Sequence, residues 1–277
     1  MTESTTQHAH EMNTDGKGSY AEVHGLKMYY EIHGEGFPLV LLHGGLSTMV
    51  TSFGKVLAGL AEGRQVIAIE QQAHGHTADV DRPLTYQQMA SDTIALLSDI
   101  GIECADFFGY SIGAGIAIEI AIEHPKVVRK LVVATPIFTA DGFHPGVLAG
   151  MEALQPEHLA GSLFHEEYKR SAPNPQDWPR LIAKTKQLDR EFVDWPSEAI
   201  ASIKAPTLLI AGDSDIVRPE HVVEMFRLLG GGVSGDHVGL PNVQLAVLPG
   251  TTHITLMDRA DWLVPMIMGF LDAPRPA

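Results

Sequence analysis

A serine stands in a setting where its hydroxyl could act as a nucleophile. Residues 109–113 read Gly-Tyr-Ser-Ile-Gly, which matches the pattern G-x-S-x-G with Ser111 at its centre. An apolar run at 106–110 precedes this turn, and a helix-forming run at 112–124 follows it. Such a strand–turn–helix lifts the serine out of the sheet and sets the positive end of a helix dipole beneath developing negative charge. The pattern predicts nucleophilic catalysis by Ser111.

A serine hydroxyl needs a general base, and the base needs an acid that orients it. In sheets that use this turn, the acid and then the histidine follow the serine along the chain. Among the histidines after Ser111, only His253 follows the last predicted strand, which favours it as the base. Two carboxylates, Asp213 and Asp215, follow the strand predicted at 206–211. We favour Asp215 as the acid and expect Asp213 to hydrogen-bond backbone N–H groups of the turn.

The oxyanion of an acyl-transfer reaction needs two backbone donors. The N–H of Ile112, directly after the serine, is the first candidate. The second should come from the loop after the apolar run 38–42, where His43 and two glycines follow. We expect the N–H of Gly45, with Leu46 as the alternative, because glycine lets the backbone approach a substrate closely. His43 is expected to shape this loop.

Strand and helix signals alternate along the chain, which predicts βαβ units and a mostly parallel sheet with helices on both faces. A hairpin at 20–32, turned at Gly25, opens the series. Further strands are predicted at 38–42, 65–69, 106–110, 130–134, 206–211 and 243–248. Helices are predicted at 49–61, 86–100, 112–124, 219–229 and 261–271.

Residues 137–203 interrupt this alternation with six prolines and short helix-like patches. We interpret them as a helical lid inserted into a core formed by 19–136 and 204–274, after a disordered polar tail at 1–18. Trp178 and Trp195 lie in the lid, and we expect both to contact substrate together with Leu46 and Tyr110. An apolar wall of this kind favours a substrate with a sizeable hydrophobic part.

Composition limits the partners of the protein. The 277 residues include 19 Lys and Arg against 34 Asp and Glu, which gives a formal net charge of −15. This charge disfavours nucleic acids and anionic membranes and suits a neutral substrate. The single cysteine, Cys104, allows no intrachain disulfide, and no apolar leader or membrane span is evident, so we expect a cytoplasmic protein. The oligomeric state stays open, a homodimer included.

The sequence resembles the α/β-hydrolase family over about residues 20–271. The resemblance rests on His43-Gly-Gly45, Gly109-Tyr-Ser-Ile-Gly113, Gly212-Asp-Ser-Asp215 and Pro249-Gly-Thr-Thr-His253. It implies an α/β-hydrolase fold, with an eight-stranded, mostly parallel sheet, helices on both faces and a lid inserted after the sixth strand. It also implies a triad that needs neither metal nor cofactor. Residues 71–77 depart from the Asp-x-x-Gly-x-Gly-x-Ser loop of many relatives, and their paired His74 and His76 are weak metal candidates.

These residues predict a serine hydrolase that cleaves a neutral, largely hydrophobic ester or lactone through an acyl-enzyme. Two alternatives use the same residues: a lactonase for acyl-homoserine lactones, and a cofactor-free perhydrolase that makes peracids. A C–C bond hydrolase is a more distant enzymatic option. From a different class, a non-catalytic ligand-binding receptor on the same fold remains an alternative.

Overall fold

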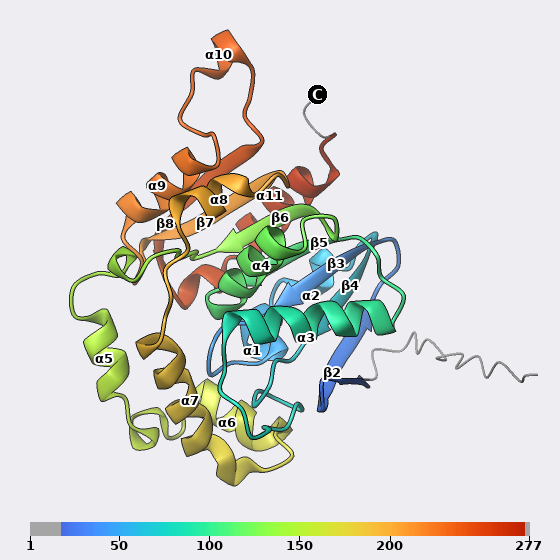
Figure 1. Ribbon diagram of the computed structural model, residues 1–277, viewed down its shortest axis with the longest axis vertical. Coiled ribbons are helices and arrows are strands. Elements are labelled where there is room, and N and C mark those ends of the chain that lie inside the picture. Colours follow the sequence, from blue (N-terminus) through green and yellow to red (C-terminus); the bar gives the residue numbers. More distant parts are fainter. Residues whose placement is uncertain (1–17, 275–277) are drawn as a thin grey trace, which may run out of the picture.

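The computed structural model describes residues 18–274 and contains a single sheet of eight strands (Figure 1). Most of the tail expected at 1–18 therefore lies outside the described residues. The sheet order is β1-β2-β4-β3-β5-β6-β7-β8. Only β2 pairs antiparallel with its neighbours, β1 and β4, and all the other pairs are parallel. The strands are β1 Ser19–Val23, β2 Leu26–His33, β3 Phe37–Leu42, β4 Arg64–Ile69, β5 Ala105–Tyr110, β6 Val128–Ala134, β7 Thr207–Ser214 and β8 Val243–Thr252. The predicted eight-stranded, mostly parallel sheet is confirmed.

Helices cover both faces of the sheet, and each face has its own apolar core. On one face lie α3 (Tyr86–Asp99), α4 (Ile112–Glu123), α8 (Ser197–Ser202) and α9 (Pro219–Leu228). On the other face lie α1 (Met49–Phe53), α2 (Leu57–Leu60) and α11 (Ala260–Asp272). The central strands are buried on both sides, so their sequences are continuous apolar runs. The helix predicted at 49–61 is interrupted by a turn at 54–56.

The segment predicted as a lid, 137–203, contains helices α5 (Val147–Ala153), α6 (Leu163–Ser171) and α7 (Trp178–Arg190). The 3₁₀ turn η1 (Ala140–Gly142) precedes α5, and η2 (Pro156–Leu159) and η3 (Pro175–Asp177) join the three helices. These helices stand together away from the sheet, whereas α8 packs against α4 and α9 (Figure 1). The predicted lid is therefore too long at its carboxyl end, because Ile200 of α8 is fully buried in the core.

Two smaller features complete the chain. The glycine-rich segment between α9 and β8 carries α10 (Gly235–Val238) and projects from the sheet (Figure 1). A 3₁₀ turn, η4 (Thr255–Asp258), connects β8 to α11. Among residues 18–274, none of the helices has the length and apolar character needed to cross a membrane.

Candidate active site

Ser111 lies at the sharp turn between β5 and α4. Its backbone has φ 56° and ψ −120°, a conformation that L-residues rarely adopt. The turn is so tight that a side chain at either flanking glycine would clash with the backbone. A Cβ added to Gly109 would lie 2.2 Å from the carbonyl oxygen of Gly113, and a Cβ added to Gly113 would lie 1.9 Å from the carbonyl oxygen of Leu42. Both flanking positions therefore require glycine. Backbone packing, and not only local sequence preference, holds the serine at the carboxyl edge of the sheet.

Three side chains from three separate loops form one hydrogen-bonded chain at this edge. The Oγ of Ser111 lies 3.0 Å from Nε2 of His253, and Nδ1 of His253 lies 2.8 Å from Oδ1 of Asp215. The Asp215 carboxylate is buried and also accepts a hydrogen bond from the Val217 N–H at 3.3 Å. This arrangement fixes the imidazole with Nδ1 donating to the carboxylate and Nε2 available to take a proton from the serine.

Asp213 has a different set of contacts. Its exposed carboxylate accepts hydrogen bonds from the Gly250 N–H at 2.9 Å and the Thr251 N–H at 3.3 Å. These bonds, with that from Gly250 foremost, lower its pKa. Asp213 thus ties the end of β8 to the end of β7, as expected for a turn residue. It positions the loop that carries His253 without touching the imidazole.

Two residues with candidate backbone donors line the cavity that contains Ser111. Within residues 18–274, the N–H groups of Gly45 and Ile112 donate to no group of the protein, and both residues line the cavity at Ser111. The N–H of Leu46 instead donates to Nε2 of His74 at 3.2 Å. Between the two residues considered for the second oxyanion donor, Gly45 is therefore the one with a free N–H.

His43 and His74 are buried beneath this loop as a neutral pair. Burial lowers the pKa of His43 to about 3 and that of His74 to about 4. Their rings lie 4.9 Å apart, and each nitrogen of His43 is occupied: Nδ1 donates to the Gly44 carbonyl at 2.8 Å, and Nε2 accepts from the Gln71 N–H at 3.0 Å. Both nitrogens of His74 likewise bond to backbone groups. The two histidines shape the loop, and His74 has no nitrogen left for a metal.

The loop after β4 keeps the spacing of the family pattern when it is counted from Glu70 and not from Gln71. Counted from Glu70, it reads Glu-x-x-Ala-x-Gly-x-Thr, with the same spacing as Asp-x-x-Gly-x-Gly-x-Ser. Thr77 donates to the Glu70 carbonyl at 2.7 Å and accepts from the Tyr29 N–H at 2.9 Å. His76 donates to the Glu70 carboxylate. The loop is thus a hydrogen-bonded support for the histidine pair.

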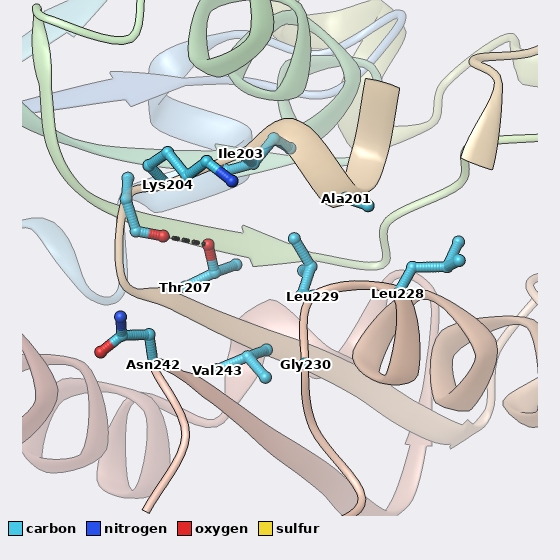
Figure 2. A pocket seen from close by; sticks show the side chains of 10 residues that line it. Ala201, Ile203, Lys204, Thr207, Leu228, Leu229, Gly230, Asn242 and Val243 are labelled. Carbon is cyan, nitrogen blue, oxygen red and sulfur yellow. Dashed lines mark hydrogen bonds between the residues drawn. The ribbon is translucent and has the colours of Figure 1, made fainter. Parts of the chain in front are cut away.

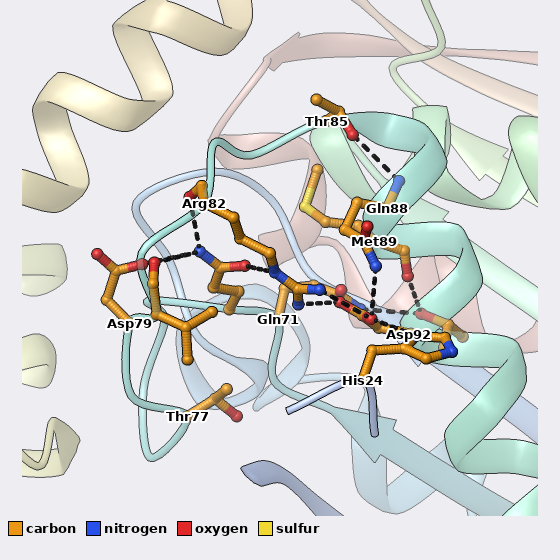
Figure 3. Close-up of polar contacts among 12 residues, drawn as sticks. His24, Gln71, Thr77, Asp79, Arg82, Thr85, Gln88, Met89 and Asp92 are labelled. Carbon is orange, nitrogen blue, oxygen red and sulfur yellow. Dashed lines mark hydrogen bonds and ion pairs between the residues drawn. The ribbon is translucent and has the colours of Figure 1, made fainter. Parts of the chain in front are cut away.

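A polar network continues from this loop into α3 (Figure 3). Arg82 bonds to Gln72 at 2.6 Å and to Asp92 at 2.5 Å, and Asp92 also contacts His24 and Gln88 at 2.9 Å. The network reaches the lid through Lys184 of α7, which donates to Asp79 at 2.6 Å and to the carbonyls of Val80 and Arg82. It therefore docks α7 onto the core.

A cavity of about 320 Å³ opens above Ser111 between the sheet edge and the lid. Its wall is predominantly apolar, with contributions from α5, α7 and the loops after β3 and β7. The lining residues are Gly44, Gly45, Leu46, Ser47, Tyr86, Tyr110, Ser111, Ile112, Thr135, Ile137, Phe143, Val147, Met151, Leu154, Leu159, Phe164, Thr185, Asp189, Ile216, Val217, His253 and Ile254. Leu46 and Tyr110, both predicted to contact substrate, are among them.

The two lid tryptophans predicted to contact substrate do not line this cavity. Trp195 donates from Nε1 to the Glu119 carboxylate at 2.6 Å and packs against Tyr86, so it anchors the lid to α4. Trp178 packs inside the lid against Tyr168, with ring centroids 5.1 Å apart. Both are nearly fully buried, because these large side chains supply the small lid with its own core. The prediction missed Tyr86, Thr135 and Asp189, polar residues that do line the cavity.

A second hollow, of about 270 Å³, lies between α8, the end of α9 and the starts of β7 and β8 (Figure 2). Because parallel strands begin at the edge opposite the one at which they end, this hollow lies across the sheet from Ser111. Lys204 is the only ionisable residue in its wall, and Thr207 is bonded to the Ala205 carbonyl at 2.9 Å. In the part of the chain that the structure describes, no cluster of three metal-ligating side chains occurs at either place.

The chain matches known hydrolases over most of its length. Residues 39–266 match the model of the alpha/beta hydrolase family, and the chain belongs to that family. RutD of Azorhizobium caulinodans, which is provisionally named a carbamate hydrolase, is 26% identical, with 91% of this chain and 97% of RutD aligned. The mouse sn-1-specific diacylglycerol lipase ABHD11 is 25% identical, with 84% of this chain and 80% of ABHD11 aligned.

Solved structures share the fold. The enol-lactonase from Burkholderia xenovorans LB400 superposes with a TM-score of 0.70 at 20% identity, covering 92% of this chain and all of the lactonase. This likeness and the family membership confirm the predicted α/β-hydrolase fold.

Proposed function

We propose that this protein hydrolyses carboxylic esters or lactones with a sizeable hydrophobic part, through an acyl-enzyme. The observation that carries the proposal is the unbroken chain from Ser111 Oγ through His253 to Asp215, with spacings of 3.0 and 2.8 Å, at the floor of an apolar cavity. That geometry allows His253 to accept the serine proton as the hydroxyl attacks a carbonyl carbon.

In the proposed reaction, Asp215 holds the imidazole and stabilises its cation. The tetrahedral oxyanion is bound by the N–H groups of Gly45 and Ile112, each worth about 2.7–4 kcal/mol in the transition state. His253 then returns its proton to the leaving alcohol, and the acyl group stays on Ser111. A water deprotonated by His253 releases the acid. The predominantly apolar wall favours hydrophobic acyl or alcohol groups over sugars.

A fluorophosphonate probe tests the nucleophile directly. We expect one covalent adduct on Ser111 by mass spectrometry, and no adduct on the Ser111→Ala variant. Labelling that leaves Ser111 unmodified would overturn the proposal and favour a ligand-binding receptor. This assay needs no knowledge of the natural substrate.

The reaction type is resolved by a substrate panel. We expect Ser111-dependent turnover of p-nitrophenyl esters of graded chain length, with the preferred length set by the cavity. Lactones with and without an acyl-amide side chain separate simple esterase from lactonase activity. Peracid formation from acetate and peroxide, faster than ester hydrolysis, would instead indicate a perhydrolase.

A further inference from the structure

The apolar cavity holds polar groups that neither the proposed triad nor the fold uses. Thr135 and Tyr86 line it and are only 2% and 8% exposed. The Thr135 hydroxyl is buried without a hydrogen-bond partner in the described chain. Nor, among residues 18–274, does any hydrogen bond engage the Tyr86 hydroxyl or the Asp189 carboxylate. Because buried polar groups are nearly always paired, the Thr135 hydroxyl points to a ligand that completes it, and the half-buried Asp189 carboxylate and the Tyr86 hydroxyl line the same cavity.

Asp189 has a defined position relative to the reacting centre. Thr185, on the same helix, lies next to the loop that carries Gly45. Its Cγ2 atom is 3.6 Å from the position that a Cβ on Gly45 would occupy. Asp189 follows four residues later and so lies on the same face of α7, about 6 Å further along the helix axis. Lys184, bonded to Asp79 at 2.6 Å, holds this helix in place.

Tyr86 lines the same cavity from the core side, where it packs against α4. A Cβ at Gly115 would lie 2.3 Å from Cε1 of Tyr86, and Gly115 is one helical turn beyond Ser111 on α4. Burial, and then the charge of Asp189, raise the pKa of Tyr86, and both residues line the same cavity. Trp195 packs edge-to-face on the Tyr86 ring, with ring centroids 5.1 Å apart, and so holds the ring in place.

The charges around this subsite select the kind of group it can hold. Among residues 18–274, no Lys or Arg lines the cavity, and Asp189 is the only carboxylate in its wall. Burial, and then the neighbouring Glu152, raises the pKa of Asp189 to about 7. About half of the Asp189 side chains are therefore ionised near pH 7, and the ionised form would repel an anionic group. A hydrogen-bond donor would supply the partner that the carboxylate lacks.

We infer that Asp189 and Tyr86 form a polar subsite of this cavity that binds a hydrogen-bond donor, a hydroxyl or an ammonium, carried by the acyl chain of the substrate. This inference rests on the proposed hydrolase function and sharpens it. The substrate class is then an ester or lactone of a chain that is apolar near the carbonyl and ends in, or carries, a donor group. Asp189 and Tyr86 are specificity-determining residues in that reaction.

Three matched esters test the subsite: p-nitrophenyl heptanoate, 6-hydroxyhexanoate and 6-aminohexanoate, which differ only in a terminal methyl, hydroxyl or ammonium. We expect Asp189→Leu to lower kcat/KM for the hydroxyl and ammonium esters, relative to heptanoate, by at least about tenfold, the effect of losing a hydrogen bond to a carboxylate. Asp189→Asn and Tyr86→Phe should give smaller shifts. Glu191→Gln, which removes an exposed charge at the end of the same helix, should leave the ratios unchanged.

The outcomes separate this inference from the proposed function. Ser111-dependent turnover with ester ratios that Asp189→Leu leaves unchanged would overturn the subsite and leave the hydrolase intact. A gain for the ammonium ester alone would support the subsite and assign it to cations. If no ester is turned over, thermal shifts of Ser111→Ala with methyl heptanoate and methyl 6-hydroxyhexanoate decide the matter. Greater stabilisation by the hydroxyl ester supports the subsite, and equal shifts overturn it.

Discussion

The hydroxyl of Tyr110 donates a 2.9 Å hydrogen bond to the backbone carbonyl of His253. The residue directly before the candidate nucleophile thus holds the loop that carries the candidate base, although the two are distant in sequence. Burial, with the Asp215 charge adding to it, raises the pKa of Tyr110, so the phenol remains a donor at neutral pH. The spacing between Ser111 and His253 is therefore set by a direct contact between their two loops.

The two neighbouring aspartates should respond differently to substitution. Asp215→Asn removes the carboxylate that orients the His253 imidazole, and we expect kcat for an aryl ester to fall by about 10³- to 10⁴-fold. Asp213→Asn keeps the triad and weakens only the bonds to the Gly250 and Thr251 N–H groups. It should lower kcat by less than about tenfold. Steady-state kinetics on both variants measure the difference, and the reverse order would move the acid to Asp213.

The glycine after the nucleophile should be required for stability. Gly113→Ala places a Cβ 1.9 Å from the Leu42 carbonyl oxygen, a backbone atom that cannot move aside. We expect a loss of about 3 kcal/mol or more in the free energy of unfolding, measured by urea denaturation. Gly150→Ala on exposed helix α5 meets no atom within 4 Å and is the matched control. It should be neutral or stabilising by up to about 1 kcal/mol. Equal stabilities would contradict the tight turn.

Acid should destabilise the protein through its buried histidine pair. The folded-state pKa values of His43 and His74 lie at about 3 and about 4, below the ordinary 6.5 that the unfolded chain restores. Between these limits the unfolded state holds more protons, so the free energy of unfolding falls as pH drops from about 6.5 towards 4. Each histidine contributes up to about 1.4 kcal/mol per pH unit.

Urea denaturation at several pH values checks this slope. His74→Gln should remove its share of the pH dependence, whereas substitution of the exposed His158 by Gln should not. An unchanged slope in His74→Gln would show that the buried pair is not its source.

The contact between Lys184 and Asp79 should control how firmly the lid is docked. Lys184→Met removes three hydrogen bonds between α7 and the loop that supports the histidine pair. We expect a stability loss of about 1–3 kcal/mol and a higher KM, because α7 also forms part of the cavity wall. Limited proteolysis should cut the lid faster than in the wild type. Lys169→Met, which removes an exposed pair on α6, is the control; equal proteolysis of the two variants would contradict the docking role.

Much of the core could be predicted because its signals are local. A strand, a G-x-S-x-G turn and a helix at residues 106–124 define the elbow without reference to the rest of the chain. The aspartates after β7 and the histidine after β8 follow from strand ends that all meet at one edge of a parallel sheet. The observed strands differ from the predicted ones mainly at the ends of β7 and β8. Both strands continue beyond their predicted ends, so that Ser214 pairs with Thr252.

The lid could not be predicted in the same detail because its contacts are made across the fold. Trp178 and Trp195 were expected on the cavity, but packing within the lid and a bond to Glu119 turn them away from it. The position of Asp189 had only a weak signal in the sequence. It is an acidic residue at helical spacing from Thr185 and Leu188, which lie on the buried face of α7. Only the assembled lid shows that this position faces Ser111's cavity.

The left-handed backbone at Ser111 sets stability against reactivity at a single residue. A non-glycine residue with φ 56° costs about 1–3 kcal/mol, which the surrounding turn must overcome each time the chain folds. Glycine at this position would relax the backbone and leave no nucleophile. The strain at Ser111 is thus a cost in stability that the fold does not need and that the proposed chemistry accounts for.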